Sequence, residues 1–318
     1  MSITRHVVVF LSAIVLLAAV SVVFAQDPVV TESEQPADTS MTIWQAAVLG
    51  VVEGVTEYLP VSSTGHLILT QRAMGLGTTA ADEEAANAYA ICIQAGAIMA
   101  VLGLYLTRVK LMLLGVVGKS VEGRRMTINV IAGFIPAAVI GLMFDDLIEQ
   151  YLFGLWPIVV AWLVGGIAIL IVARRKGKHE GPTGGLDLEQ LTWKQAMVVG
   201  LLQCVAMWPG TSRSLMTIVG GVVVGLNLAA AVEFSFLLGL VTLSAATAYE
   251  TLKSGQVMLE MYGFTSLAVG FVTATVSAVI AVKWMVAYLN KHGLEIFGYY
   301  RVLLALIIGG LLLGGVMS

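Results

Sequence analysis

The chain has 318 residues, of which 58% are hydrophobic and only 12% charged, and its mean hydropathy is +0.92. Soluble domains carry roughly a quarter charged residues, so this composition excludes a soluble protein and predicts an integral protein of the lipid bilayer. The net charge of -3 says little by itself, because the positions of Lys and Arg matter more in a membrane protein. No nucleic-acid partner is expected.

Residues 1–25 have the features of a secretory signal sequence. A short basic start at Arg5 and His6 precedes the apolar run 7–23, and a small-residue pattern that suits cleavage follows. The alternative is an uncleaved anchor helix, because the apolar run is almost long enough to span a bilayer. In both cases we expect residues 1–40 to form a signal-like or anchor segment with a polar linker outside the cytoplasm.

Six apolar segments after Met41 are each about the 20 residues that a bilayer requires, and they are predicted to be transmembrane helices. They are 88–107, 126–145, 156–173, 230–250, 264–288 and 300–317. Two further apolar stretches, 43–73 and 195–226, are broken near their middles by proline or glycine among polar residues. Such breaks occur at membrane depth only where protein or a cavity satisfies the backbone. We therefore expect an all-α polytopic membrane protein with six transmembrane helices and two re-entrant helix hairpins.

Clusters of basic residues predict the orientation of these segments. Lys and Arg crowd the loop 108–125 and again the loop 174–178, and the positive-inside rule places both loops in the cytoplasm. It follows that the 43–73 hairpin enters from outside and the 195–226 hairpin enters from the cytoplasm.

Three matches in the same order along the chain indicate an internal duplication. The segment GVVEGVTEYLPVSS at 50–63 matches GLLQCVAMWPGTS at 200–212 with a gap of one residue. The two weaker matches pair 132–139 with 269–276 and 153–170 with 297–314.

Each half holds three spans, an odd number, so the two halves should have opposite orientation. We expect inverted repeats at about 41–175 and 190–318 within one membrane domain, 41–318. Repeats of this kind place functional sites near the membrane midplane, where broken helices meet.

The stretch EGVTEYLPVSSTGH, which begins at Glu53, is unusually polar for this chain. Glu53 and Glu57 are four residues apart and share a helix face. A proline ends this helix, and Ser62 or Ser63 can cap the next one. His66 follows about one turn later and is expected to face the carboxylates; a purely structural role is its main alternative.

The stretch WPGTSRS at 208–214 interrupts the second hairpin in the same way. Arg213 supplies a fixed cation that can grip phosphate bidentately, and free backbone N–H groups at the start of the next helix favour an anion. We expect the following residues of the two stretches and their flanks to bind substrate: Ser62, Thr64, Gln203, Gly210, Thr211, Ser212 and Ser214.

The two stretches together indicate metal-assisted phosphoryl transfer. Arginine, hydroxyls and helix N-termini suit phosphate, whereas paired glutamates alone would repel it. Glu53 and Glu57 are therefore expected to bind Mg²⁺ or Ca²⁺, which prefer oxygen ligands, while catalysis rests mainly on positioning and charge stabilisation. The rival is a transporter or flippase for a phosphorylated lipid, because inverted repeats around a midplane site are typical of transporters.

The segments EGVTEYLPVSSTGHLIL, with its E-x-x-x-E pattern, and WPGTSRS, with its P-G-x-S-R-S pattern, closely resemble the undecaprenyl-pyrophosphate phosphatase family, also called bacitracin-resistance proteins. The resemblance runs from about residue 41 to the C-terminus and includes EFSFLLG at 233–239. It implies metal-dependent hydrolysis of undecaprenyl pyrophosphate to undecaprenyl phosphate and inorganic phosphate in the bacterial inner membrane. This reaction recycles the lipid carrier of peptidoglycan precursors.

The resemblance also implies roles for single residues. Glu53 and Glu57 would serve metal binding or acid–base work, Ser63 would be the nucleophile, His66 its acid–base partner and Arg213 the phosphate clamp. The sequence leaves open whether Ser63 attacks phosphorus or only positions substrate for a metal-bound water. The expected partners are a polyprenyl diphosphate lipid and the bilayer, with a homodimer as an option that the sequence leaves open.

Overall fold

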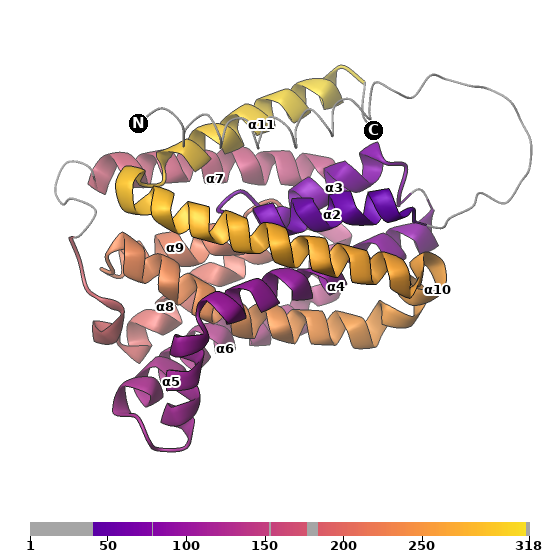
Figure 1. Cartoon of the computed structure of the whole chain (residues 1–318). Coiled ribbons are helices and arrows are strands. Elements are labelled where there is room, and N and C mark those ends of the chain that lie inside the picture. The colour runs from indigo at the N-terminus through magenta and orange to yellow at the C-terminus, as the bar shows by residue number, and fades with distance from the viewer. Residues whose placement is uncertain (1–40, 78, 153, 177–183, 316–318) are drawn as a thin grey trace, which may run out of the picture.

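The computed structural model describes residues 41–77, 79–152, 154–176 and 184–315 (Figure 1). The expected signal-like or anchor segment, 1–40, lies outside these residues. The described chain is helical and holds no β-strand, only one isolated bridge between Leu186 and Leu226. Its elements are α2 (Ile43–Thr56), α3 (Ser63–Ala73), α4 (Ala80–Leu104), α5 (Leu106–Val116), α6 (Val121–Leu152), α7 (Leu155–Lys176), η1 (Leu188–Gln190), α8 (Trp193–Cys204), η2 (Val205–Met207), α9 (Arg213–Val223), α10 (Leu228–His292) and α11 (Glu295–Leu313).

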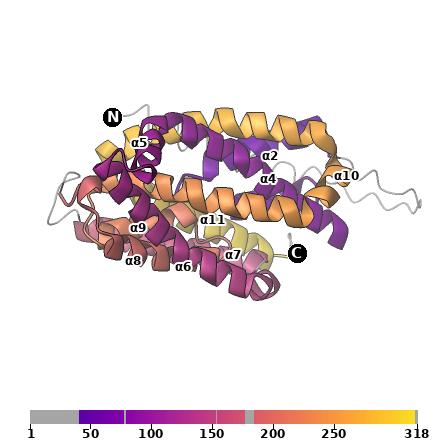
Figure 2. The same cartoon turned by 90° about the horizontal axis from the view of Figure 1, so that it is seen from below.

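Five of these helices, α4, α6, α7, α10 and α11, are long and apolar enough to cross a membrane. The expected all-α fold is thereby confirmed, with several apolar helices that suit membrane spans. The 65-residue α10 is interrupted at Gly263, whose φ of 75° and ψ of 160° are not helical. Gly263 turns the chain back, so that α10 consists of two arms, 228–262 and 264–292, with α4 packed between them (Figures 1 and 2).

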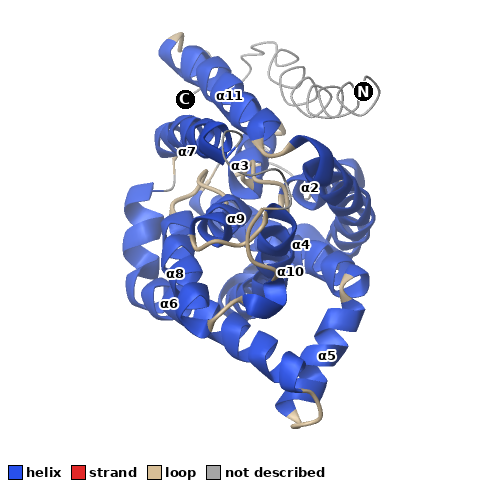
Figure 3. Cartoon of the chain, turned by 90° about the vertical axis from the view of Figure 1, so that its left-hand side faces the viewer, coloured by secondary structure: helices blue, strands red, loops and turns tan. Residues whose placement is uncertain are grey.

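The basic segment 108–125, expected to be a loop, is largely helical. It comprises most of α5 and the start of α6, which together project from one end of the bundle (Figures 1 and 3). Arg108 contacts three carboxylates here: its Nε lies 2.6 Å from Glu233 and its Nη1 lies 3.1 and 3.4 Å from Glu189 and Glu122. The ion pairs fasten the projecting segment to the bundle.

Two pairs of short helices enter the bundle from opposite ends (Figure 1). The first hairpin is α2 and α3 with its tip at residues 57–62, and the second hairpin is α8 and α9 with its tip at residues 205–212. The two tips touch inside the bundle, where the Ser214 hydroxyl donates a 2.9 Å hydrogen bond to the Leu59 carbonyl. The two helix interruptions that the sequence predicts therefore lie side by side.

The open end of each hairpin is closed by the same pair of side chains, a threonine and a glutamine. Thr42 and Gln45 form a capping box at the start of α2, and Thr192 and Gln195 form one at the start of α8. Each glutamine also donates to the carbonyl at the far end of its hairpin, Gln45 to Met74 at 3.2 Å and Gln195 to Val224 at 2.9 Å. The side-chain amide thus ties the first helix of each hairpin to the end of the second.

The register between the hairpins differs from the sequence match. Thr192 lies 150 residues after Thr42, and Ser212 lies 150 residues after Ser62. These two serines are the described non-glycine residues with positive φ, 74° and 77°, and each directly precedes a helix. The one-residue gap in the sequence match is therefore wrong: it aligned the two prolines, whereas the left-handed residue before each helix sets the structural register.

Glycines let each hairpin pack closely against a helix of the other half of the chain. A Cβ on Gly50 of α2 would lie 3.0 Å from the Cα of Gly270 on the second arm of α10. A Cβ on Gly200 of α8 would lie 2.9 Å from the Cα of Gly133 on α6. Because small residues allow helix backbones to approach in this way, the two halves are interlocked around the tips.

We expect Gly50→Ala to lower the free energy of unfolding by about 1–3 kcal/mol, because the added methyl would collide with the Thr273 hydroxyl and also with the backbone of Gly270. Thermal unfolding in detergent measures the change. Gly103→Ala on α4 is the control, since open space surrounds that glycine, and it should keep the wild-type Tm. An unchanged Tm for Gly50→Ala would contradict the close helix approach.

Candidate active site

The two tips meet at a cavity of about 520 Å³, here called the site pocket. Eight of the residues expected from the sequence line it: Glu57, Ser62, Ser63, Thr64, Gln203, Gly210, Ser212 and Arg213. The remaining walls come from α4, α6 and α10 and are largely apolar, with Phe134, Leu142 and Leu243 among them. A polar end formed by two hairpins and an apolar wall formed by long helices suit a molecule with a charged head and a hydrocarbon tail.

Glu57, at the end of α2, is the centre of the polar cluster. Its carboxylate is buried, and each of its two oxygens has a partner. The Ser63 hydroxyl donates a 2.5 Å hydrogen bond to Oε2, and Nη2 of Arg213 donates a 3.0 Å hydrogen bond to Oε1. Glu57 therefore joins the first residue of α3 to the first residue of α9 across the pocket.

Arg213 is held rigidly at the start of α9. Its Nη1 donates a 3.0 Å hydrogen bond to the Ser235 carbonyl, and its guanidinium lies over the ring of Tyr58, 5.1 Å from the centroid. Gly239 leaves the space that the guanidinium fills, because a Cβ there would meet it. Its buried Nε has no hydrogen-bond partner among the described residues. The cation thus has a fixed position beside the pocket.

Two helix N-termini point at the pocket from opposite sides. The left-handed backbone of Ser62 and Ser212 lets α3 and α9 begin abruptly after an extended tip. The Ser212 hydroxyl caps α9 by accepting a 3.3 Å bond from the Leu215 N–H, whereas Ser62 caps α3 with no side-chain bond. The first N–H groups of a helix and its dipole attract anions. The pocket is therefore suited to two linked phosphates.

His66 does not take the position expected for it. Its Nδ1 lies 2.6 Å from the Ser62 carbonyl, which can only accept, so the proton is on Nδ1. Its Nε2 lies 2.7 Å from the Tyr300 hydroxyl. Both ring nitrogens are thus occupied away from Ser63, and His66 does not line the site pocket. The expectation that it faces the carboxylates is wrong, because a contact with a helix 234 residues away decides its direction.

Three other expected residues lie behind the pocket. Glu53 is 1% exposed, one helical turn before Glu57, and its Oε1 has no partner among the described residues. Ser214 binds the carbonyl of the first tip, as described above, and Thr211 is buried in the second tip, where its N–H donates to the Trp208 carbonyl. Ser214 and Thr211 therefore stabilise the tips rather than line the pocket.

The donor set fits a divalent cation only if substrate completes the site. Glu53 offers one unpartnered buried oxygen, and Glu57 offers oxygens that are already hydrogen-bonded. Nowhere in the described chain do three or more His, Cys, Asp or Glu side chains cluster closely enough to hold a metal ion. Mg²⁺ is commonly bound by one or two carboxylates together with substrate phosphates. Glu57 in the pocket and Glu53 one helical turn behind it would fit that arrangement.

Sequence reasoning missed the residues that hold the tips from outside. Trp162 of α7 donates a 3.1 Å bond to the Val61 carbonyl, and Arg301 of α11 donates to the carbonyls of Pro60 and Gly210. An arginine within an apolar, membrane-spanning segment is costly and signals a specific partner. This signal was present at Arg301 in the sequence.

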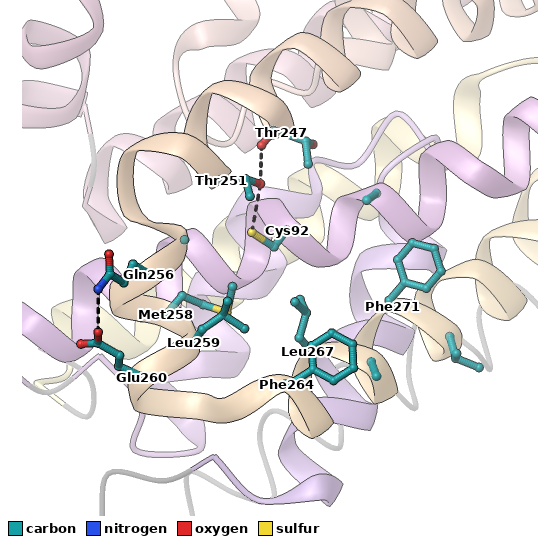
Figure 4. A pocket seen from close by; sticks show the side chains of 14 residues that line it. Cys92, Thr247, Thr251, Gln256, Met258, Leu259, Glu260, Phe264, Leu267 and Phe271 are labelled. Carbon is teal, nitrogen blue, oxygen red and sulfur yellow. Dashed lines mark hydrogen bonds between the residues drawn. The ribbon is translucent and has the colours of Figure 1, made fainter.

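A second cavity, about 730 Å³, lies between α4 and the two arms of α10 (Figure 4). Phe264, Leu267 and Phe271 form much of its wall, and Glu260 is the only charged residue among those that line it. Thr251 bonds Cys92 there at 3.5 Å. With no cation in its lining, this cavity is unsuited to phosphate, and the site pocket is the better candidate.

Comparison of the sequence with known proteins shows the family of this chain. Residues 46–307 match the family described as bacitracin resistance protein BacA. The chain is 41% identical over 271 residues to an undecaprenyl-diphosphatase of Ectopseudomonas mendocina, a match that covers 84% of this chain and 94% of the relative. It is 40% identical over 267 residues to an undecaprenyl-diphosphatase of Aquifex aeolicus, covering 84% and 97%. The chain therefore belongs to the BacA family of bacitracin resistance proteins.

Proposed function

We propose that this protein is an undecaprenyl-diphosphatase. It hydrolyses undecaprenyl pyrophosphate to undecaprenyl phosphate and inorganic phosphate, and so recycles the lipid carrier of peptidoglycan synthesis and contributes to bacitracin resistance. The observation that carries the proposal is the Glu57–Ser63–Arg213 cluster, which lies between two helix N-termini in a pocket with apolar walls. The names of the relatives agree with it.

The proposed setting is the bacterial inner membrane. There α4, α6, α7, the two arms of α10 and α11 would form six spans, and the two hairpins would be re-entrant, within inverted repeats. The opposite entry of the hairpins and their separation of 150 residues support this topology. Because the structure consists of one chain, the homodimer stays a prediction, as does the lack of a nucleic-acid partner.

The diphosphate would bind between the two tips, with the isoprenoid chain along the apolar walls of α6 and α10. Arg213, which lines the pocket, would pair with phosphate oxygens through its guanidinium. The backbone N–H groups at the starts of α3 and α9 would share the remaining negative charge. Charge on both phosphates is thereby neutralised before the reaction, which lowers the barrier in phosphoryl transfer.

Glu57, rather than His66, would activate Ser63, since Glu57 accepts the hydrogen bond of the Ser63 hydroxyl. As the Ser63 oxygen forms a bond to the terminal phosphorus, its proton passes to the Glu57 carboxylate that it already contacts. The anhydride bond breaks and undecaprenyl phosphate leaves with the electron pair. A water molecule then hydrolyses the phosphoserine and returns the enzyme to its starting state. In the alternative route water attacks directly, Glu57 takes its proton and Ser63 only orients the substrate.

Glu53 and one oxygen of Glu57 would hold Mg²⁺ or Ca²⁺, which would supply positive charge at the phosphates when bound. His66 acts on the shape of the site, since its N–H bonds the carbonyl of the strained residue Ser62. The comparisons do not favour the rival function, a transporter or flippase. Purified protein in detergent separates the two directly: an enzyme releases phosphate from undecaprenyl pyrophosphate, and a transporter releases none.

We expect Ser63→Ala to reduce phosphate release by about 100-fold or more, because it removes the attacking oxygen. Mass spectrometry of the acid-quenched wild type should find phosphate on Ser63 during turnover. Thr70→Val on the same helix is the matched control, since the Thr70 hydroxyl bonds only its own helix at the His66 carbonyl. A Ser63→Ala variant that keeps most of its activity would rule out the serine route and favour attack by water.

Arg213→Lys should lower kcat/KM by about 100-fold, although it keeps the positive charge. A single ammonium cannot reproduce the planar fork that contacts both Glu57 and the Ser235 carbonyl. Arg124→Lys, at an exposed position on α6, is the control and should behave as wild type. Near-normal kinetics for Arg213→Lys would mean that charge alone, without bidentate contact, binds the diphosphate.

Removal of divalent metal with EDTA should abolish phosphate release, and Mg²⁺ or Ca²⁺ should restore it. Glu53→Gln should raise the metal concentration for half-maximal activity by about tenfold or more, because it removes a carboxylate ligand. Titration of activity against free metal gives both results. Full activity in EDTA would disprove a metal requirement, and an unchanged titration for Glu53→Gln would show that Glu53 is not a ligand.

A further inference from the structure

Arg301 of α11 is a buried cation that the proposed reaction does not use. Its side chain is 0% exposed and is among the largest fully buried side chains of the described chain. Within that chain no carboxylate lies at ion-pair distance from it, unlike Arg108 and Arg213. A buried charge without such a partner costs several kcal/mol unless hydrogen bonds compensate it. Its place therefore calls for a specific explanation.

Three backbone carbonyls from three segments surround the guanidinium. Nη1 donates to Pro60 at 3.4 Å, and Nη2 donates to Gly210 at 2.7 Å and to Ala161 of α7 at 2.9 Å. Pro60 lies in the first tip and Gly210 in the second. One side chain thus bonds both tips at once, shortly before Ser62 and Ser212, which precede α3 and α9.

The surroundings fit the guanidinium closely. Gly165 of α7 faces it, and a Cβ at that position would collide with the guanidinium nitrogens. The preceding residue, Tyr300, reaches the first tip by a second path, because its hydroxyl bonds His66 and His66 bonds the Ser62 carbonyl. Two consecutive residues of α11 therefore hold the backbone on which the reacting groups stand.

We propose that Arg301 is a positioning residue that locks the two tips in one register, so that Ser63 and Glu57 on one tip face Arg213 on the other. Arg301 does not line the site pocket. The inference rests on the proposed function, since register between tips matters only if both act on one substrate. A displacement of about 1 Å in such a constellation can cost roughly a hundredfold in rate.

Arg301→Met tests the proposal, because it keeps the length and apolar stem but removes the hydrogen bonds. With undecaprenyl pyrophosphate, kcat should fall by about 100-fold while KM stays within about threefold of wild type. Arg301→Lys should recover part of the loss, since an ammonium can bond some of the three carbonyls. A rise in KM with unchanged kcat would instead indicate contact with substrate, and unchanged kinetics for Arg301→Met would overturn the proposal.

Amide hydrogen exchange reports the register without relying on activity. In Arg301→Met, exchange should speed up in both tips, 57–62 and 205–212, and stay unchanged in α4 and α6. A merely structural role would raise exchange throughout the bundle or only along α7 and α11, and either result would overturn the proposal. If wild-type protein releases no phosphate, the proposed function fails, whereas the exchange result still decides whether Arg301 fixes the tips.

Gly165→Ala keeps Arg301 but pushes its guanidinium away from the tips. This variant replaces Arg301→Met in the test if Arg301→Met does not fold. We expect kcat to fall by about tenfold and exchange to rise in both tips. Gly310→Ala on α11 is the matched control, because open space surrounds that glycine and its kinetics should be those of wild type. Equal behaviour of the two alanine variants would count against the proposal.

Discussion

The interaction on which the structure depends is the hydrogen bonding of non-helical backbone inside an apolar bundle. Each hairpin tip exposes carbonyls that lipid cannot satisfy. The protein supplies partners from its own side chains: Ser214 for Leu59, Trp162 for Val61, and Arg301 for Pro60 and Gly210. With these carbonyls bound, the opposite faces of both tips are left to line the site pocket. The bonds that make broken helices tolerable thus also shape the site.

The residues of the site divide into those that face the pocket and those that hold it. Glu57, Ser63 and Arg213 form one connected cluster in the pocket. His66, Ser214 and Arg301 bind backbone behind it. Residues of the second group contact backbone carbonyls. The type of side chain at these positions therefore says little about the reaction. A histidine in a polar motif is therefore not by itself evidence of acid–base catalysis.

Much of the arrangement could be predicted from sequence, since its signals are local. Proline and glycine breaks in apolar stretches indicated both hairpins, and Glu57 and Arg213 stood out as charges in apolar segments. The direction of His66 could not be predicted, because Tyr300 of a distant helix sets it. The gap placed between the two hairpin sequences was wrong, since alignment rewarded paired prolines while backbone conformation at Ser62 and Ser212 fixed the register. The role of Arg301 could not be predicted from its segment, which the sequence marks as a transmembrane helix and a repeat match, because its partners Ala161 and Gly210 lie far away in the chain.

Positions 150 residues apart are equivalent in the two hairpins, and at one such pair of positions the two side chains differ in chemistry. Ser63 and Arg213 each follow a left-handed serine and each begin a helix, so they hold equivalent places on opposite tips. The same backbone conformation thus presents a hydroxyl from the first tip and a guanidinium from the second tip. A diphosphate is nearly symmetric in its charge, and two identical tips would accept it in either sense. The serine at one of these places and the arginine at the other would distinguish its two ends in the proposed reaction, with the tail-free phosphate at the hydroxyl.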